Sequence, residues 1–361
     1  MSDRAAAVVI GDTHIHNFRH GGPLDEHEVS LRANQVLRGM LEVAERHDPE
    51  WFIQLGDLHH VANPPPAIIG ATRRVLERIA QRSKIVILAG NHDLASDRAH
   101  TLLAYQGMHN VFVVPPSCTF VGCPYVVAVA WATKQDVFRQ ALDQCNGQNT
   151  QQRVLVAHAA VVAGGVIADS STEASAVLLE CPRDRRPTII SGHLHNFQKY
   201  NAQKVIQLGA FHGTAHGEFN VGHYMVRSQA GAWSVHRQCV PVVMNTTEKT
   251  HEADLQLLAS INPRCFGYFS AAVQSSPQDD RNANALQLAL RSQRASMGGS
   301  VEVRWNPQVG QTALAQPDDL DLKHHDLLSA ASSLLPTEIK HREEVLNLAQ
   351  DLAVAAQAEE S

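Results

Sequence analysis

The sequence lacks a long apolar run, a paired-cysteine motif and an excess of positive charge. No apolar stretch in its 361 residues approaches the roughly 20 that a membrane helix needs, so we expect a soluble protein without membrane partners. Its six cysteines are scattered without a Cys-x-x-Cys pair, which argues against a disulfide or zinc framework and agrees with a reducing compartment. The net charge of −6 excludes a generally basic coat for nucleic acid but leaves a local basic groove open.

The N-terminal apolar segment, residues 5–10, is too short for a secretory signal, so we expect a cytoplasmic protein. A single core rarely grows beyond about 250 residues, which predicts one main domain with appendages. The chain has 21 histidines, and their positions matter because histidine is both a common metal ligand and a proton carrier near neutral pH.

Short apolar runs with β-branched residues and flanking Gly or Pro predict strands that are buried on both faces. They lie at 5–10, 51–55, 84–89, 111–114, 125–131, 154–157, 188–190 and 205–208. Apolar residues at helical spacing within 31–44 and 68–79 predict helices between the first three strands. The fold class is therefore α/β.

Smaller elements are expected after this α/β region. Residues 224–227 and 233–237 read as a closing hairpin, and Pro241 with the polar stretch 245–250 indicates a boundary. The predicted domains are a main domain over 1–240, a small α+β domain over 250–306, a linker over 307–317 and a helix pair over 318–358.

Polar clusters follow five of the predicted strands. They are Gly11-Asp12-Thr13-His14, Gly56-Asp57-Leu58-His59-His60, Gly90-Asn91-His92-Asp93, Ala157-His158 and Gly192-His193-Leu194-His195. The carboxyl ends of strands face the ligand crevice in open α/β sheets, so these clusters should converge on one site.

The spacing within two clusters indicates metal binding. Asp12 and His14, and likewise His193 and His195, are two residues apart, and such residues point to the same side of an extended chain. Carboxylate, imidazole and amide ligands suit divalent Mn, Fe or Zn, and the absence of Cys argues against a structural zinc site.

Each cluster also has a simpler interpretation. Asp12, Asp57 and Asn91 could cap the helices that follow them, and His158 could be a hydrogen-bonded core histidine. Five ligand-rich clusters at five strand ends, however, favour a shared metal centre.

The ordered set GDTH, GDLHH, GNHD, AH and GHLH resembles the calcineurin-like metallophosphoesterase superfamily over about residues 8–215. The resemblance implies a four-layer α-β-β-α sandwich and two divalent metal ions that hydrolyse a phosphate ester. It implies one metal on Asp12, His14 and His195, another on Asn91, His158 and His193, and Asp57 as the bridge.

The resemblance also implies catalytic residues. His92 would stabilise the transition state or protonate the leaving alkoxide, Asp93 could orient its imidazole, and His60 would support it as in the nuclease branch. We interpret His16 and His59 as residues that surround the site or lie on the surface.

Three features resemble SbcD-like nuclease subunits, including those of large bacteriophages. They are the segment 205–218, in which Gly209-Ala210-Phe211 replaces the family's Gly-Ser/Thr-Pro, the small domain and the terminal helix pair. The small domain could equally be a generic appendage, and the helix pair could pack on its own domain.

The resemblance implies a Mn-dependent DNA exonuclease or endonuclease that binds DNA and an SbcC-like coiled-coil ABC-type ATPase, and it suggests a homodimer. A phage protein of this kind would act in the host cytoplasm. Arg19, His20 and Arg98 could supply positive charge for DNA. Two alternatives stay open: an enzyme for small phosphodiesters, nucleotides or phosphoproteins, and a partner-binding scaffold with a vestigial metal site.

Overall fold

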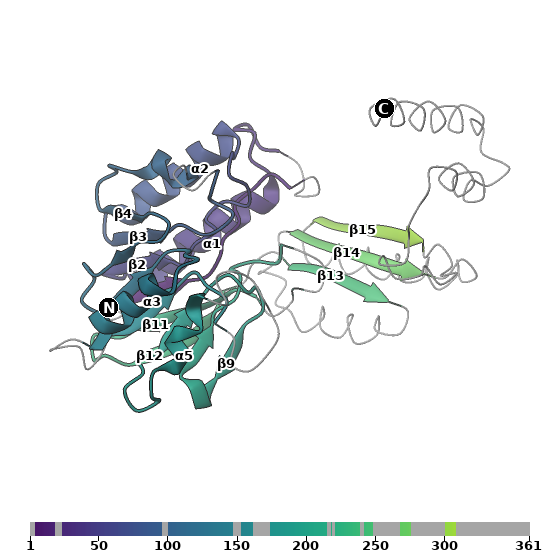
Figure 1. Ribbon diagram of the computed structural model, residues 1–361. Coiled ribbons are helices and arrows are strands. Elements are labelled where there is room, and N and C mark those ends of the chain that lie inside the picture. Colours follow the sequence, from purple (N-terminus) through teal and green to yellow (C-terminus); the bar gives the residue numbers. More distant parts are fainter. Residues whose placement is uncertain are drawn as a thin grey trace, which may run out of the picture. The chain divides into compact units, whose positions relative to one another are not determined.

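The computed structural model describes residues 4–18, 24–95, 100–146, 153–161, 174–214, 218, 221–238, 242–247, 268–275 and 300–307 (Figure 1). The chain divides into two compact units, residues 1–308 and 309–361, and every described residue lies in the first unit. The predicted helix pair at 318–358 and nearly all of the linker therefore lie outside the described residues and stay predictions.

The first sheet has six strands. They are β1 (Ala7–Ile10), β2 (Trp51–Gln54), β3 (Lys84–Leu88), β4 (Val111–Val114), β11 (His223–Arg227) and β12 (Trp233–Arg237). Their order is β12-β11-β1-β2-β3-β4, in which β1 to β4 are parallel and β11 and β12 form an antiparallel hairpin. Helices α1 (Leu31–His47) and α2 (Pro66–Ala80) connect the first three strands, as the sequence predicts.

The second sheet also has six strands. They are β5 (Thr119–Phe120), β6 (Val126–Val129), β7 (Val154–Ala157), β8 (Ile189–Ser191), β9 (Gln198–Tyr200) and β10 (Val205–Gln207). Their order is β5-β6-β7-β8-β10-β9, with antiparallel edge strands on either side of four parallel strands. Helices α3 (Gln135–Asn146) and α5 (Val177–Glu180) and the 3₁₀ turn η2 (Asn201–Gln203) complete this region, whereas the 3₁₀ turn η1 (Thr101–Tyr105) lies between β3 and β4 of the first sheet.

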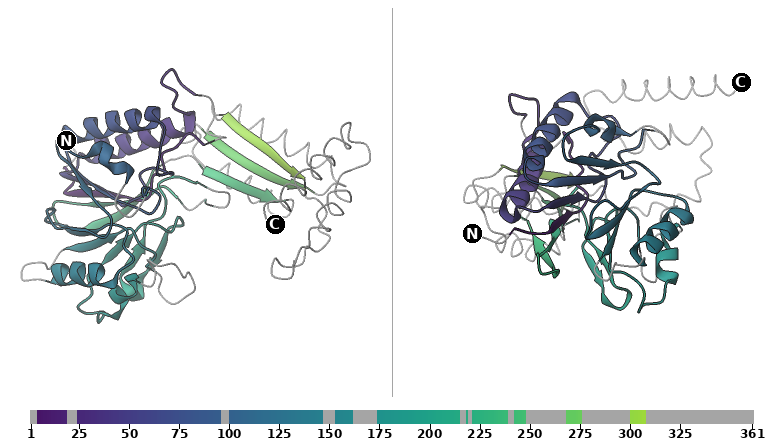
Figure 2. Two further views of the ribbon diagram at one scale, coloured as in Figure 1. Left: turned by 45° about the horizontal axis from the view of Figure 1, so that its top comes forward. Right: turned by 90° about the vertical axis from the view of Figure 1, so that its left-hand side faces the viewer.

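Strand β6 shows how the layers are arranged. Val126 and Ala128 belong to the large core that also contains the first sheet, whereas Val127 and Val129 pack with Phe138 of α3 in a second core. Because successive residues of a strand point to opposite faces, the second sheet lies between the first sheet and α3. The views in Figure 2 show α1 and α2 on the far side of the first sheet. The predicted four-layer α-β-β-α sandwich is confirmed.

A third, three-stranded sheet follows in the chain. It consists of the parallel strands β13 (Val242–Thr247), β14 (Tyr268–Ser275) and β15 (Ser300–Pro307), in that order. Strand β14 and nearly all of β15 lie in the region 250–306 that the sequence assigns to a small α+β domain, whereas β13 lies before it and includes Asn245, which the sequence assigns to a boundary. The connections over 248–267 and 276–299 lie outside the described residues, so the small α+β domain stays a prediction.

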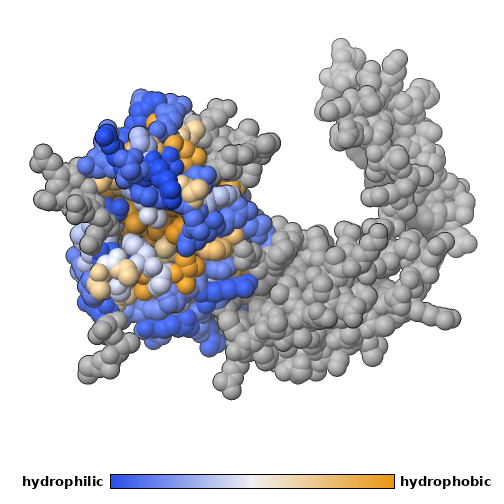
Figure 3. Space-filling view, turned by 90° about the horizontal axis from the view of Figure 1, so that it is seen from below, coloured by the Kyte–Doolittle hydropathy of each residue, from blue (hydrophilic) through white to orange (hydrophobic). Residues whose placement is uncertain are grey.

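Among the described residues, no helix has the length and apolarity needed to cross a membrane. Figure 3 shows apolar residues gathered between hydrophilic surfaces on one face of the molecule.

The second core, between α3 and the second sheet, depends on Phe138 of α3, which is 0% exposed. Replacing it with Ala should lower the free energy of unfolding by about 3–5 kcal/mol, because a large buried side chain is lost and a cavity is left. Phe112→Ala is the matched control, since Phe112 is 39% exposed on β4 and should cost clearly less. Urea denaturation measures both, and equal losses would contradict the assigned layers.

Candidate metal centre

All seven predicted metal ligands lie just beyond the carboxyl ends of parallel strands from both large sheets. Asp12 and His14 follow β1, Asp57 follows β2, Asn91 follows β3, His158 follows β7, and His193 and His195 follow β8. The predicted ligands therefore converge where the carboxyl ends of strands from the two sheets meet, and the position of the polar clusters after strands predicts this convergence.

The first group of ligands consists of Asp12, His14 and His195, whose donor atoms all lie within 4.8 Å of one another. The Nε2 atoms of His14 and His195 are 3.0 Å apart. Asp12 is fully buried, and its Oδ1 accepts no hydrogen bond from the residues that the structure describes. A buried carboxylate oxygen without a donor, beside two converging imidazole nitrogens, fits a divalent cation.

The second group consists of Asp57, His158 and His193, again with donor atoms within 4.8 Å. Asn91 joins it, because its Oδ1 lies 3.0 Å from His158 Nε2 and 3.0 Å from His193 Nδ1. Asp57 Oδ2 lies 3.4 Å from His158 Nε2 and 3.6 Å from His14 Nε2. This carboxylate oxygen thus faces both groups, a position that suits a bridging ligand.

The ligand loops have unusual backbone conformations. His14, Asp57 and His193 have backbone φ angles of 41°, 48° and 76°. These lie in the left-handed region, which residues other than Gly rarely adopt. His14 and His193 therefore depart from the extended backbone that the sequence analysis assumes for the Asp-x-His and His-x-His motifs. Such strain is held in place at functional sites by the surrounding structure.

Two glycines allow the carboxylates to lie against the backbone. A Cβ atom at Gly90 would lie 2.1 Å from Asp57 Oδ1, and one at Gly192 would lie 2.3 Å from Asp12 Oδ1. A larger residue at either position would displace a predicted ligand.

The electrostatics of the centre are dominated by buried charge. Burial alone would raise the pKa of Asp57, but the neighbouring His158 holds that pKa below its usual range. Burial lowers the pKa of His158, but the charges of Asp57 and Asp12 outweigh it and raise the pKa. The carboxylates thus require a positive neighbour, and a proton on His158 fills that role where no cation is bound.

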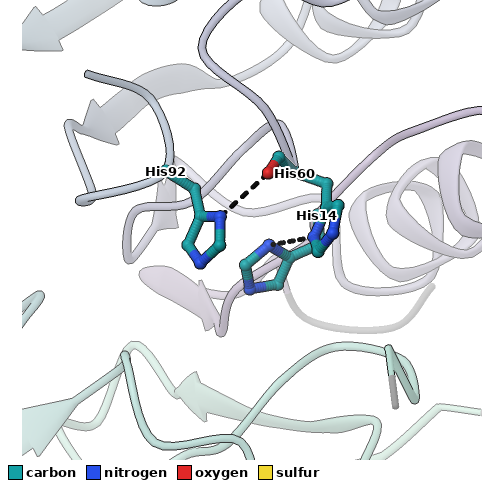
Figure 4. A group of neighbouring side chains, drawn as sticks. All are labelled: His14, His60 and His92. Carbon is teal, nitrogen blue, oxygen red and sulfur yellow. Dashed lines mark hydrogen bonds between the residues drawn. The ribbon is translucent and has the colours of Figure 1, made fainter. Parts of the chain in front are cut away.

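His92 lies beside the ligands, stacked on His60 (Figure 4). The two ring centroids are 5.3 Å apart with an interplanar angle of 19°. His92 Nδ1 lies 2.8 Å from the carbonyl oxygen of His60, and His60 Nδ1 lies 3.4 Å from His14 Nδ1. Because a carbonyl can only accept, Nδ1 of His92 carries a hydrogen and donates it.

Asp93 is fully buried beneath the same loop. Its carboxylate accepts hydrogen bonds from the backbone N–H groups of Gly90 at 3.0 Å, His59 at 3.2 Å and Leu58 at 3.3 Å. Among the described contacts, the group that faces Nδ1 of His92 is the carbonyl of His60 and not Asp93. Burial, with the nearby charge of Asp57, raises the pKa of Asp93 to about 7.

Two further histidines surround the site. His59 is fully buried and its Nε2 lies 2.7 Å from the Tyr105 hydroxyl, so it is a core residue. His16 packs its ring edge-on against Phe18 and tilted against His60. Arg19, His20 and Arg98, which the sequence suggests for DNA binding, lie outside the described residues.

Glu218 is a site residue that the sequence reasoning missed. Its Oε1 accepts a hydrogen bond from His195 Nδ1 at 2.7 Å, and Oε2 accepts from the backbone N–H and hydroxyl of Thr214 at 2.7 and 2.9 Å. Burial would raise the pKa of Glu218, but His195 and Thr214 lower it to about 2. The distance between Glu218 and His195 along the sequence gives no signal of this contact. In the fold, His195 follows β8 and Glu218 follows β10, and these two strands are neighbours in one sheet.

The family model that describes calcineurin-like phosphoesterases matches residues 6–197, more than half of the chain. The chain belongs to the calcineurin-like phosphoesterase family. No curated protein matches this sequence. A solved structure of the nuclease MPE from Pseudomonas putida is 14% identical, with 64% of this chain and 88% of that chain covered and a TM-score of 0.30.

Family membership makes the chain a metal-dependent phosphoesterase, and the family generally binds two divalent metal ions. The two ligand groups fit such a pair. When bound, the ions supply positive charge that attracts phosphate oxygens and stabilises the transition state. The two ligand groups would hold the ions, and His92 and His60 lie beside these groups.

The free energy of unfolding of this phosphoesterase should fall in acid, because His212 is fully buried. Burial, followed by the charge of Arg32, lowers the pKa of His212 to about 3, whereas an unfolded histidine has a pKa of about 6.5. The contribution of the neutral His212 ring to the free energy of unfolding is therefore complete above about pH 6.5 and decreases as the pH drops toward 3. His212→Gln should lose less unfolding free energy between pH 7 and pH 4 than the wild type, measured by urea denaturation.

The matched control is His27→Gln, because the His27 side chain is 60% exposed and should leave the pH profile unchanged. An unchanged slope in the His212 variant would contradict the assigned neutral state of the buried ring.

Proposed function

We propose that this phosphoesterase is a Mn-dependent DNA nuclease subunit that acts in the cytoplasm. The observation that carries the proposal is the stacked pair of His60 and His92 beside the two ligand groups. The GDLHH and GNHD motifs that supply the pair resemble those of the calcineurin-like superfamily, and His60 resembles a supporting histidine of its nuclease branch. One imidazole of such a pair can hold a phosphate oxygen while the other protonates the leaving alkoxide of a phosphodiester.

The hydrogen bonds of the pair divide these roles. Nδ1 of His92 donates to the His60 carbonyl, so the proton that His92 gives up must leave from Nε2. Burial, with the neighbouring His92, lowers the pKa of His60 to about 4, so the His60 ring is neutral at pH 7. His60 Nδ1 faces His14 Nδ1 at 3.4 Å and can accept its hydrogen, which leaves the N–H of its Nε2 as a donor for phosphate.

A partly exposed aromatic side chain beside the pair supports a nucleic-acid substrate. The Phe18 ring lies 4.7 Å from the His60 ring, and the guanidinium of the buried Arg32 packs against Phe18 with its carbon 4.1 Å from the ring centroid. Aromatic surfaces stack on bases without regard to sequence.

Purified protein with Mn²⁺ should release nucleotides or fragments from linear duplex DNA, and EDTA should abolish the reaction. A parallel assay with bis(p-nitrophenyl) phosphate tests the alternative of a small-ester enzyme. Efficient turnover of the small ester with intact DNA would overturn the nuclease proposal. No hydrolysis of either substrate by metal-loaded protein would favour a partner-binding scaffold.

His92→Ala should lower the rate of DNA cleavage by about 10²–10⁴-fold, because the proton donor for the leaving group is lost. Its bound Mn²⁺, measured by atomic absorption, should match the wild type, since His92 is not among the seven predicted ligands. His27→Ala is the matched control on the exposed surface. Full activity of the His92 variant would remove the assigned mechanism.

We further propose that residues 318–358 bind an SbcC-like coiled-coil ABC-type ATPase and that the nuclease is a homodimer. The apolar spacing of Leu327, Leu328, Leu346 and Leu352 supports an amphipathic helix pair that needs a partner groove. A chain without residues 318–361 should no longer elute with the ATPase in size-exclusion chromatography. Undiminished association would contradict the proposal.

A further inference from the structure

One histidine of each ligand group, His195 and His158, differs in the group that its Nδ1 atom contacts. In the first group, Nδ1 of His195 donates to the carboxylate of Glu218 at 2.7 Å. In the second group, Nδ1 of His158 donates to the backbone carbonyl of Leu55 at 2.8 Å. Both contacts leave the Nε2 atom free to bind a cation. A carboxylate that accepts the Nδ1 hydrogen makes the imidazole more basic, and therefore a stronger metal ligand, than a neutral carbonyl does.

Glu218 is itself held in place. The hydroxyl of Thr214 lies 2.9 Å from Glu218 Oε2 and 3.0 Å from His195 Nδ1, and the N–H of Thr214 donates to the same carboxylate oxygen at 2.7 Å. The side chains of His195 and Glu218 are only 22% and 14% exposed, so solvent weakens their interaction little.

The segment that carries Thr214 and Glu218 is also attached to the ligand Asp12. Ala210 pairs with Asp12 as an isolated bridge, and the N–H of Phe211 donates to the carbonyl of Asp12 at 2.7 Å. One stretch of chain after β10 therefore orients two of the three ligands of the first group. The Gly209-Ala210-Phe211 departure noted in the sequence forms this attachment.

The two groups also differ in their own charge. Asp12 belongs to the first group, whereas the second group has the neutral amide of Asn91 in the corresponding place, and both groups face Asp57. Adding Glu218 behind His195 increases this difference, because a divalent cation is attracted more strongly by the more negative surroundings.

We propose that Glu218 is a positioning residue that makes Asp12, His14 and His195 the tighter of the two cation sites, so that a divalent cation occupies this site first. At limiting cation concentration the protein then holds one ion, and the second site, next to His158, fills only as the concentration rises. The inference rests on the paired ligand groups and is independent of whether the ester substrate is DNA.

Titration of metal-free, full-length protein with Mn²⁺ by calorimetry should resolve a tight and a weak binding event. Glu218→Gln keeps the size of the side chain and removes its charge, and should weaken the tight event by about 10–100-fold while the weak event stays within about 3-fold. The control Glu26→Gln removes a carboxylate that is 86% exposed and should change neither event. An unchanged tight event, or a change confined to the weak one, would overturn the proposal.

Thr214→Val provides a second, milder variant, because it removes one hydrogen bond to Glu218 and leaves the charge in place. Its tight event should weaken less than that of Glu218→Gln but in the same direction, and wild-type affinity in both variants would also overturn the proposal. With Co²⁺ in place of Mn²⁺, the visible absorption of the first equivalent should change in Glu218→Gln and keep its wild-type form in Glu26→Gln. If the nuclease assay left DNA uncleaved, the nuclease proposal would fail, but these metal-binding measurements would still test the role of Glu218.

Discussion

The structure depends on two aspartates that are buried side by side at the ends of neighbouring strands. Asp12 is 0% exposed after β1 and Asp57 is 1% exposed after β2. A buried carboxylate is unfavourable unless hydrogen bonds and positive charge surround it. The backbone N–H of His193 donates to Asp12 Oδ2 at 2.7 Å, that of His92 donates to Asp57 Oδ1 at 2.8 Å, and His158 supplies positive charge beside both carboxylates. A bound cation would take over the role of the His158 proton.

Much of this was predictable from the sequence because its signals are local. A buried parallel strand is a short β-branched run, so all eight expected strands are present, and the seven predicted ligands lie just beyond the carboxyl ends of five of them. The missed elements include the 12-residue helix α3, which the sequence analysis left unassigned, as well as the short α5 with four residues and β5 with two. The turns within the ligand motifs could not be read from residue spacing, and Glu218 and the carbonyl of His60 act through contacts that only the tertiary structure creates.

His60 illustrates why side-chain identity alone does not define a catalytic residue. Its backbone carbonyl orients His92, its ring stacks on His92, and its Nδ1 faces His14. A substitution at this position therefore removes the ring contacts but leaves the carbonyl in place. The carboxylate of Asp93 acts in the opposite way, since its side chain holds the backbone of the neighbouring loop.

The position of the centre across two sheets has a consequence for the cohesion of the sandwich. Asp12 and His14 follow a strand of the first sheet, while His195 follows a strand of the second, so one bound ion would join the two halves as a removable cross-link. A ligand that binds only the folded state adds about 4 kcal/mol of stability at a concentration 1,000 times its dissociation constant. Loading with metal would thus reinforce the contact between the two sheets that their shared core already makes, so the supply of metal would set part of the resistance of the sandwich to unfolding.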